Sequence, residues 1–480
     1  MIWTRRSMLA GFGAATLTGC SKTGSRRRPP TTPNVLRVAV PQAQRTRLDS
    51  GARLYFAEDR TVPLVAVAVT IPAGLRHDPA NIPGVASMAI GLLLDHENQG
   101  RTARFAELGA TLVGNIADST AVLQCTVRRA DAPAALRLLV DSVRNLPTDT
   151  ATFERVRSHH LGALESLRGS PANVAGLGVV LGSYGVSPPT RVLAAGTPHS
   201  VGGVSVGYVR QWHADRARPG GANFAVAGDA SLEEATRWVE EAAAHWSTDA
   251  GPKVGPAAPQ HRKRGPRVVL VPWPMSQQCT IAYGGRRAAP DSADAMVEKT
   301  ADAVISGAVT SVLRTSGRMT YGTRPENWTT RFGRLRYDVF TIERFDVEPA
   351  VHALNILSEW LLARPLLDYQ EIDGARQQSL ASLMAASTGP ENMMRRLLAW
   401  ADRDLDPPSA EYEIKTREGL TLLTLEKAML RLSRRARLRI CVVGDRETID
   451  HAHKVLGSDG VEERTANALI GDTEIGDTDG

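Results

Sequence analysis

Two short clusters in the sequence combine side chains that bind transition metals. Asp95, His96 and Glu97 are consecutive, and His159 is followed by His160. Neighbouring helix residues point about 100° apart, so His159 and His160 would not bind one metal ion together. The stronger zinc patterns His-Glu-x-x-His and Cys-x-x-Cys do not occur. We interpret residues 95–100 as the polar end of a helix with its loop, and keep a relocated metal site around His96 and His159 as the alternative.

The first twenty residues are predicted to be an export signal. Arg5 and Arg6 precede a weakly apolar run from Met8 to Gly19 that is too short to span a bilayer, which is typical of a twin-arginine signal. The run ends in Leu-Thr-Gly-Cys20, similar to a bacterial lipobox, so Cys20 is the expected lipidation site. An ordinary signal peptide with a chance cysteine is the alternative. We therefore expect an exported protein, lipid-anchored to the cell membrane or outer membrane and facing the periplasm or cell exterior.

The remaining cysteines and the charge distribution narrow the class of protein. Cys125, Cys279 and Cys441 each lie in a strand-like run, which favours buried free thiols over a disulfide framework. Residues 1–34 hold six Arg and Lys and no acid, and residues 461–480 hold six acids and one Arg. Without these ends the net charge of +6 becomes +5, which is spread along the body without a dense basic and aromatic stripe and argues against nucleic-acid binding. No later segment reaches the roughly eighteen consecutive apolar residues of a membrane span.

The elements that would position any site are predicted to form two similar halves. Residues 247–266 are rich in Pro, Gly and charge and are expected to be a linker. On each side of it, β-branched runs precede a long helix, which begins at Pro83 in one half and at residues 291–292 in the other. Each half closes with an apolar strand ending in Gly-Asp, at Asp229 and Asp445, where the Asp is placed to cap the next helix.

This pattern predicts an α+β fold made by duplication. Its domains would be a signal (1–20), a flexible tether (21–34), an N-terminal domain (35–246), the linker (247–266), a C-terminal domain (267–460) and a disordered acidic tail (461–480).

The first half resembles the pitrilysin/insulinase family of zinc peptidases. The family carries His-x-x-Glu-His on a helix after a Gly-(Leu or Val)-Ala lead, and here Gly84-Val-Ala supplies that lead. The two His places and the Glu place fall on Ser87, Gly91 and Ile90, none of which can bind zinc or accept a proton as that motif requires. Residues 101–112 continue the resemblance. The family's third ligand comes from a downstream helix, and its place falls on Gly162 in the segment that begins at residue 153.

The resemblance implies two domains of the LuxS/metallopeptidase-like type, each a mostly antiparallel sheet with helices on one face. It also implies loss of the zinc site, so no metal is expected in this chain. Ser87 could be imagined as a nucleophile, but the alignment places no His or acid to activate it.

The second half resembles the family's second domain, in which an Arg and a Tyr seven positions apart contact the substrate. The segment from Leu313 to Gly322 matches without a gap, so Arg314 and Tyr321 take these places. An Arg can hold a peptide carbonyl or a developing oxyanion, and a Tyr hydroxyl can donate to the same oxygen. Arg318 departs from the pattern, because the family prefers Gly there. Alternatively, Arg314 is a cation at a helix C-terminus and Tyr321 a strand residue with a bonded hydroxyl.

Some bacterial members of the family are heterodimers in which one subunit supplies zinc and the other the Arg/Tyr pair. The resemblance therefore implies a non-catalytic, substrate-binding subunit similar to the alpha-type subunits of processing peptidases. Its expected partners are a zinc-bearing paralogue and an unfolded peptide. The alternatives are a structural or assembly lipoprotein, a metallopeptidase with a relocated metal site, and a hydrolase with an unfamiliar site.

Overall fold

The fold is described from a computed structural model. It describes residues 40–79, 82–95, 99–185, 196–246, 265–289, 292, 294–330, 333–363, 369–434 and 437–470. The predicted signal with Cys20, the tether and nearly all of the predicted linker lie outside these residues. No helix in the described part of the chain is long and apolar enough to cross a membrane.

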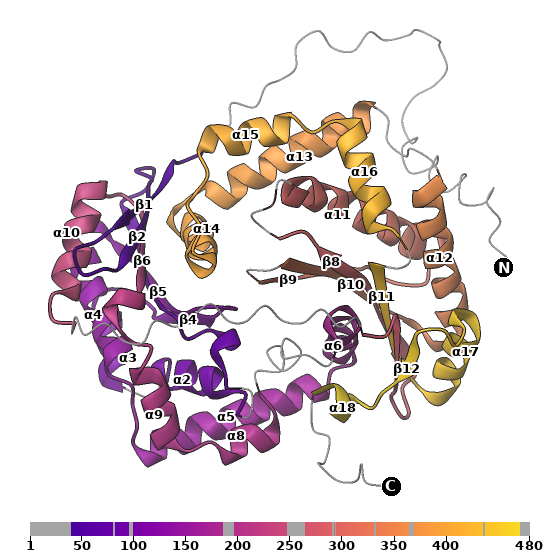
Figure 1. Ribbon diagram of the computed structural model, residues 1–480, viewed down its shortest axis with the longest axis horizontal. Coiled ribbons are helices and arrows are strands. Elements are labelled where there is room, and N and C mark those ends of the chain that lie inside the picture. The colour runs from indigo at the N-terminus through magenta and orange to yellow at the C-terminus, as the bar shows by residue number, and fades with distance from the viewer. Residues whose placement is uncertain are drawn as a thin grey trace.

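Two six-stranded sheets, one in each half, form the framework (Figure 1). The first has the order β1-β2-β6-β3-β5-β4 and the second the order β12-β7-β11-β8-β10-β9. The pairs β2–β6, β7–β11 and β7–β12 are parallel, and all other pairs are antiparallel. The strands are β1 (Ala43–Arg47), β2 (Arg53–Glu58), β3 (Leu64–Ile71), β4 (Val113–Ile116), β5 (Ala121–Arg128), β6 (Asn223–Gly228), β7 (Val268–Pro272), β8 (Gln278–Arg287), β9 (Arg324–Thr330), β10 (Gly333–Glu343), β11 (Leu438–Gly444) and β12 (Val461–Glu463).

Helices connect and cover the strands. In the first half they are η1 (Leu75–His77), α2 (Val85–Leu93), α3 (Gln99–Glu107), η2 (Arg129–Asp131), α4 (Ala132–Arg144), α5 (Thr150–Arg168), α6 (Pro171–Tyr184), α8 (Pro198–Gly203), α9 (Val206–Ala214), η3 (Pro219–Gly221) and α10 (Leu232–Ala243). In the second half they are α11 (Asp294–Thr310), η4 (Ser311–Ser316), η5 (Arg344–Asp346), α12 (Val347–Ala363), α13 (Tyr369–Ser387), α14 (Pro390–Arg403), α15 (Ala410–Glu418), α16 (Leu422–Leu432), α17 (Arg446–Leu456) and α18 (Ala466–Ile470).

The two halves repeat one another closely. Helices α5 and α13 have the same length, as do α6 and α14, and both pairs are separated by 219 residues (369 − 150 and 390 − 171). The same ion pair also recurs. The Arg that opens the 3-10 turn pairs with the Asp after the last strand, Arg129 with Asp229 at 3.1 Å and Arg344 with Asp445 at 3.2 Å. The duplication inferred from the Gly-Asp ends thus extends to side-chain contacts.

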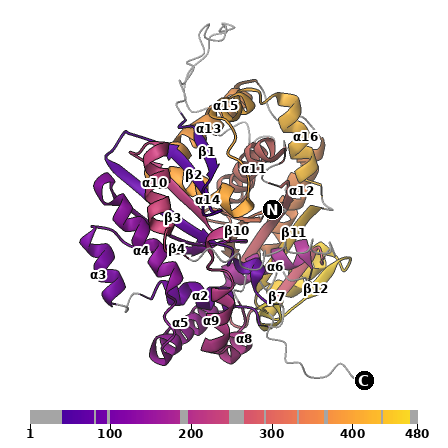
Figure 2. The same cartoon turned by 60° about the vertical axis from the view of Figure 1, so that its left-hand side comes forward.

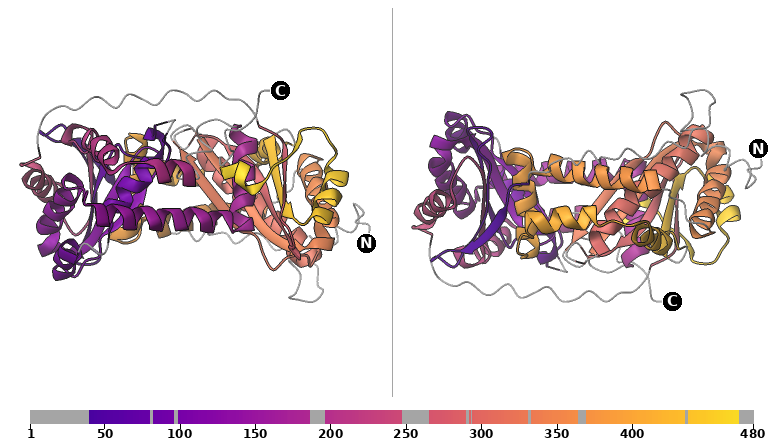
Figure 3. Two further views of the ribbon diagram at one scale, coloured as in Figure 1. Left: turned by 90° about the horizontal axis from the view of Figure 1, so that it is seen from below. Right: turned by 90° about the horizontal axis from the view of Figure 1, so that it is seen from above.

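The halves exchange one helix each. Helix α6 belongs to the first half by sequence but packs on β7, β8, β10 and β11, and α14 packs on β2, β3 and β6 of the first sheet. Figure 1 shows each of these helices against the sheet of the opposite lobe, and Figure 3 shows long helices running between the lobes. Each sheet is therefore covered on one face by its own half and on the other by a helix from its partner half.

Residue alternation along the strands matches these two coverings. In β3, Val65, Val67 and Val69 face the large core formed with α2, α4, α5 and α10, while Ala66 and Ala68 face α14. Figure 2 shows α4 and α10 beside the first sheet. Helix α6 packs closely on the second sheet because it carries glycine at the contact. A Cβ at Gly178 would lie only 2.7 Å from the Cβ of Cys441. The three described cysteines are buried and free, as expected from the sequence.

The α+β class and the two-sheet architecture are confirmed, and the exchanged helices add a second covered face to each sheet. Three expectations need correction. Helix α2 ends at Leu93, and the long helix expected after Pro83 does not form because the chain turns at Leu94 and Asp95 binds Arg155. Ser231, not Asp229, caps α10, whereas Asp445 does cap α17.

The prediction of a disordered acidic tail is wrong for residues 461–470. Residues 461–463 form β12, which pairs with β7, and α18 packs against α6 and α5. This strand supplies the sixth member of the second sheet, in the place that β1 takes beside β2 in the first. Edge pairing satisfies backbone groups of β7 that would otherwise be exposed, which explains why this acidic segment is ordered.

Candidate functional site

The helix that would carry a zinc motif is α2, and a distant carboxylate fixes its start. Gly84 precedes it with φ of 103°, a left-handed conformation that favours glycine. The Asp78 carboxylate accepts hydrogen bonds from the amides of Gly84 and Ala86, both at 2.7 Å. These bonds satisfy donors that a helix N-terminus leaves free, so the backbone of the motif is retained although its ligands are absent.

Ser87 and Ile90 offer no hydrolytic chemistry. Both side chains are buried, with 8 % of each residue exposed. The Ser87 hydroxyl has no hydrogen-bond partner among the described residues, so no described base is within reach of it. Ile90 belongs to the large core of the first half. The interpretation of Ser87 as an activated nucleophile therefore has no geometric support in the described part of the chain.

The other two positions are glycines, one facing a filled space and one facing an open surface. A Cβ at Gly91 would lie 2.7 Å from Cγ1 of Val156, so a side chain of α5 fills the place of a ligand. Gly162 lies on the exposed side of α5, and a Cβ there would have no described atom within 4 Å. Zinc sites need several converging donors at about 2.0–2.3 Å. The residues Ser87, Ile90, Gly91 and Gly162 do not fit a zinc ion.

The alternative metal cluster receives no support from the described residues. No group of three or more His, Cys, Asp or Glu side chains among them could hold a metal ion. Asp95 is committed to the Arg155 guanidinium at 2.7 Å, and His159 is exposed on α5. His96 and Glu97 lie outside the described part of the chain.

Buried titratable groups instead surround the N-terminal side of α2. Burial, assisted by the guanidinium groups of Arg216 and Arg76, lowers the pKa of His77 to about 4. Burial likewise lowers the pKa of His213 to about 4, and its Nε2 has no hydrogen-bond partner in the described residues. Burial raises the pKa of Asp78 to about 6, although the two amides oppose this shift. This network supports the fold, because the two imidazoles are kept neutral and the carboxylate caps a helix.

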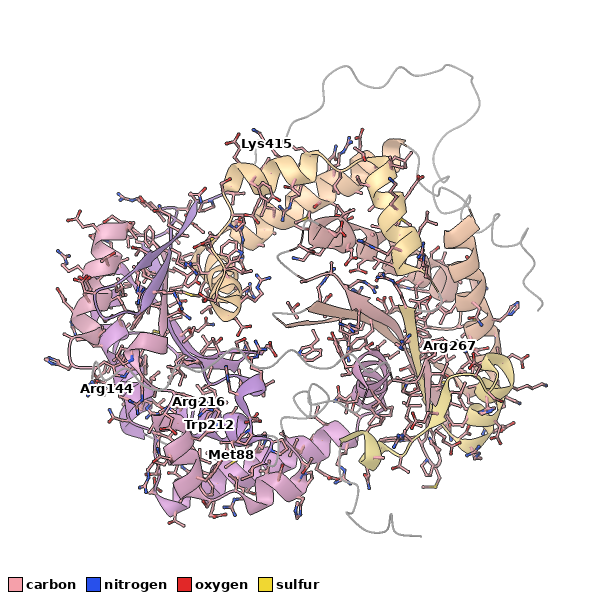
Figure 4. All side chains as sticks on the ribbon, viewed as in Figure 1. Met88, Arg144, Trp212, Arg216, Arg267 and Lys415 are labelled. Atoms are coloured by element: carbon pink, nitrogen blue, oxygen red, sulfur yellow. The ribbon has the colours of Figure 1, made fainter. Side chains whose placement is uncertain are left out.

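Arg216 and its neighbour Trp212 cover part of this region. The guanidinium of Arg216 lies 4.2 Å from the Trp212 ring centre, and the indole NH of Trp212 donates to the carbonyl of His77 at 3.3 Å. Figure 4 shows Trp212 and Arg216 close together near Met88 of α2. A cation stacked on an aromatic ring and a bonded indole NH are typical of stable packing.

Arg314 and Tyr321 lie at the end of the counterpart helix in the second half. Arg314 is exposed in the π-helical turn η4, which follows α11 directly. Tyr321 is 98 % exposed, in a bend three residues before β9. No described residue bonds to either side chain, so the alternative of a strand tyrosine with a bonded hydroxyl is wrong. The helix-end position of Arg314 is confirmed. Both side chains are free to contact another molecule.

Arg318, the departure from the family pattern, has a clear conformation. Its φ of 53° is in the left-handed region, just after the π turn, where Met319 N donates to Leu313 O. A left-handed conformation costs a non-glycine residue about 1–2 kcal/mol. The family's preference for Gly at this place is therefore a backbone requirement, which this chain meets with a strained Arg. Turns of the π type often occur at functional sites.

Comparisons with known proteins agree with this geometry. Residues 203–323 match the model of the peptidase M16 inactive domain. This match includes Arg314 and Tyr321. This segment of the chain is similar to an M16 inactive domain. The resemblance to the pitrilysin/insulinase (M16) family is thereby confirmed.

Solved structures extend the fold likeness of this M16-like chain to most of its length. The peptidase M16 inactive domain from Pseudomonas fluorescens superposes with a TM-score of 0.71 at 19 % identity, over 84 % of this chain and 98 % of that one. A protease from Helicobacter pylori gives a TM-score of 0.70 at 12 % identity, over 85 % and 100 %. The first half of the periplasmic protease PqqL from Escherichia coli gives 0.64 at 14 %, over 86 % and 95 %. A comparison with curated protein sequences gives no significant match.

The inactive-domain match agrees with the prediction that the M16-like chain is not catalytic on its own. Sequence reasoning missed one feature, a cavity beside Lys299 in the second half. The constant spacing of 219 residues between α5–α6 and α13–α14 could have drawn attention to it, because that spacing aligns the helices around the vacant zinc positions with those around the cavity.

Proposed function

We propose that this M16-like chain is the zinc-lacking, substrate-binding subunit of a heterodimeric zinc peptidase. In this role it is exported, lipidated at Cys20 and held at the membrane, and a zinc-bearing paralogue faces it across the substrate. The chain contributes Arg314 and Tyr321, and the partner contributes the metal and the base.

The observation that carries the proposal is the exposure of this pair. A tyrosine that is 98 % exposed gains no packing energy from its own chain, so the fold does not need the ring at that position. Arg314 is also exposed, on the turn that leads to the same bend. An Arg guanidinium and a Tyr hydroxyl can each donate a hydrogen bond to a peptide carbonyl oxygen. The pair therefore suits binding of an extended peptide.

The need for a partner follows from the other half. Ser87, Ile90, Gly91 and Gly162 cannot bind zinc, so hydrolysis of the family's type requires a metal from a second chain. The likeness to a periplasmic protease supports export, together with the sequence of residues 1–20. Both the partner and the anchor are parts of the proposal.

The test is reconstitution with a zinc-motif paralogue from the same genome. We expect the two chains to co-purify and to cleave an unfolded peptide in a chelator-sensitive reaction, while this chain alone has neither zinc nor activity. Arg314→Ala should lower kcat/KM by about 10²-fold, and Tyr321→Phe by about tenfold, as found for lost oxyanion donors and single hydrogen bonds. Arg324→Ala and Tyr208→Phe are matched controls at exposed positions and should leave the activity unchanged.

Two outcomes would overturn the proposal. If Arg314→Ala and Tyr321→Phe leave the activity of the complex intact, the chain has an assembly role and does not bind substrate. Stoichiometric zinc in the isolated chain would point to a metal centre outside the described residues.

A further inference from the structure

A cavity of about 560 Å³ lies between α11, α13, α14 and α15 of the second half. Helix α13 contacts the other three, and in Figure 1 α11 lies by the second sheet whereas α14 lies against the first. Small-molecule sites typically have volumes of about 300–1,000 Å³, so the cavity is large enough for a small organic ligand. Its walls are partly made of small side chains, including Ala303, Ser379, Ser382 and Ala399, which leave the space open.

The cavity occupies the place that corresponds to the vacant zinc site of the first half. Counted from the starts of α2 and α11, the positions of Ser87, Ile90 and Gly91 correspond to Met296, Lys299 and Thr300, and all three of the latter line the cavity. By the spacing of 219 residues, Gly162 corresponds to residue 381, and its neighbour Ser382 also lines the cavity. In the first half, the Val156 side chain occupies the space beside Gly91, whereas the space beside Thr300 in the second half is the cavity.

The cavity wall carries more positive than negative charge. Lys299, Arg396, Arg403 and Arg417 line it together with two carboxylates, those of Glu413 and Asp406. Asp406 is committed to Arg45 at 2.7 Å, and Glu413 pairs with Arg396. Both carboxylates of the wall therefore already form ion pairs, and the wall has more cationic than anionic side chains.

Two of the cations lack a close counter-ion. The Arg417 side chain is 9 % exposed, its Nε has no hydrogen-bond partner among the described residues, and its nearest carboxylate oxygen, on Glu413, is 4.0 Å away. No described residue forms a hydrogen bond or ion pair with the Lys299 amine. Arg417 also donates to the backbone carbonyl of Glu413 at 2.7 Å, so its guanidinium is only partly satisfied. An exposed amine without a counter-ion beside a buried guanidinium whose carboxylate is 4.0 Å away makes this wall suited to an anion.

Lys299 is an exposed residue of α11 whose side chain lines the cavity. Burial by the surrounding protein, together with the nearby guanidinium groups of Arg334, Arg403 and Arg417, lowers the pKa of its amine to about 8, while Glu413 opposes the shift. A bound anion would favour the charged amine and raise this pKa again.

We propose that this cavity binds an organic anion, with its carboxylate held by Lys299 and Arg417 and its apolar part against Met296, Leu383 and Trp400. The carboxylate could belong to the C-terminus of a short apolar peptide or to a fatty acid, which present the same chemistry. The site is separate from Arg314 and Tyr321 and does not depend on the proposed peptidase partner.

Calorimetric titration of the isolated full chain at pH 7 tests the proposal. The probes are N-acetyl-trileucine with a free carboxylate, its C-terminal amide, and decanoate. We expect at least one carboxylate probe to bind and the amide not to bind. Binding of the peptide acid alone identifies a peptide terminus, and binding of decanoate alone identifies a fatty acid.

Variants separate the site from adventitious binding. Lys299→Met should weaken the binding at least tenfold, and Lys299→Arg should restore it. Lys415→Met is the matched control, because Lys415 lies on α15, pairs with Glu411 and points away from the body in Figure 4. The proposal fails if neither carboxylate binds, if the amide binds as tightly as the acid, or if folded Lys299→Met binds as the parent does. None of these outcomes bears on zinc-dependent cleavage, so the two proposals can fail separately.

Discussion

Replacing Gly178 by Ala tests the exchange of helices directly. Gly178 lies on α6, and its Cβ would be 2.7 Å from Cβ of Cys441, still closer to the sulfur, and 3.4 Å from Cβ of Val269 on the second sheet. Neither strand can yield easily, because both are central in the sheet. Overpacking of this kind costs about 1–3 kcal/mol.

The opposing term is helix propensity. Ala in a helix interior is more favourable than Gly by about 0.5–1 kcal/mol. Gly162→Ala on α5 is the matched control, because its Cβ would have no described atom within 4 Å. The control should therefore gain about 0.5–1 kcal/mol, and Gly178→Ala should be less stable than the control by about 1–3 kcal/mol, the packing cost itself.

Thermal and urea unfolding of both variants, followed by circular dichroism, measures this difference. A second substitution, Cys441→Ala, removes the closest atom and should recover part of the loss in the Gly178→Ala background. If Gly178→Ala stabilises the chain as much as Gly162→Ala does, α6 does not pack on the second sheet, and the arrangement of the halves described above is wrong.

Three further predictions follow from named contacts. Arg318→Gly should stabilise the chain by about 1 kcal/mol, because it removes a left-handed non-glycine residue; a lower melting temperature would show that the Arg side chain has a compensating contact. The free energy of unfolding should fall as the pH drops from about 6.5 to 4, because in this range His77 and His213 bind protons in the unfolded chain but not in the native one. Asp78 has the opposite effect, because its raised pKa lets the native chain bind a proton at a higher pH than the unfolded chain does, and it cancels the contribution of about one histidine. His213→Phe should flatten this slope in urea titrations at several pH values, and an unchanged slope would exclude His213 as a cause. Asp402→Ala should cost about 2–3 kcal/mol in thermal unfolding, because its Oδ1 accepts two backbone amides and a hydroxyl at 2.9 Å; Asp402→Asn, which keeps an acceptor, should lose less, and equal losses would contradict this explanation.

Local patterns in the sequence predict local structure well here. The apolar runs that end in Gly-Asp became the central strands β6 and β11. Absence of ligands at Ser87, Ile90 and Gly91 is visible from residue types alone, because no arrangement of these side chains binds zinc.

Features that depend on distant segments were not predictable in this way. Helix α6 carries three glycines, which are unfavourable in a helix by propensity: Gly176, Gly178 and Gly182. Their role becomes clear only from the structure, because each lies too close to the second half for a side chain. The left-handed conformation of Arg318 follows from the π turn before it. A π turn has no characteristic pattern of apolar residues, so the sequence does not reveal it. The cavity at Lys299 is lined by four helices that are up to about a hundred residues apart, so no single stretch of sequence reveals it.

The exchange of helices also determines when each face of the first sheet can be covered during synthesis of the chain. The first sheet is complete at Gly228, but α14, which covers its second face, begins 162 residues later (390 − 228). At synthesis rates of about 5–20 residues per second, that face stays uncovered for roughly 8 to 30 s before α14 is made. Ala66, Ala68, Ala225 and Ala227 line much of it beside Tyr55 and Val122, and methyl groups present little apolar area to other chains during that interval. A face built of small side chains is thus suited to a late-arriving cover, whereas the valine face of the same strands is covered by helices that are synthesised within its own half.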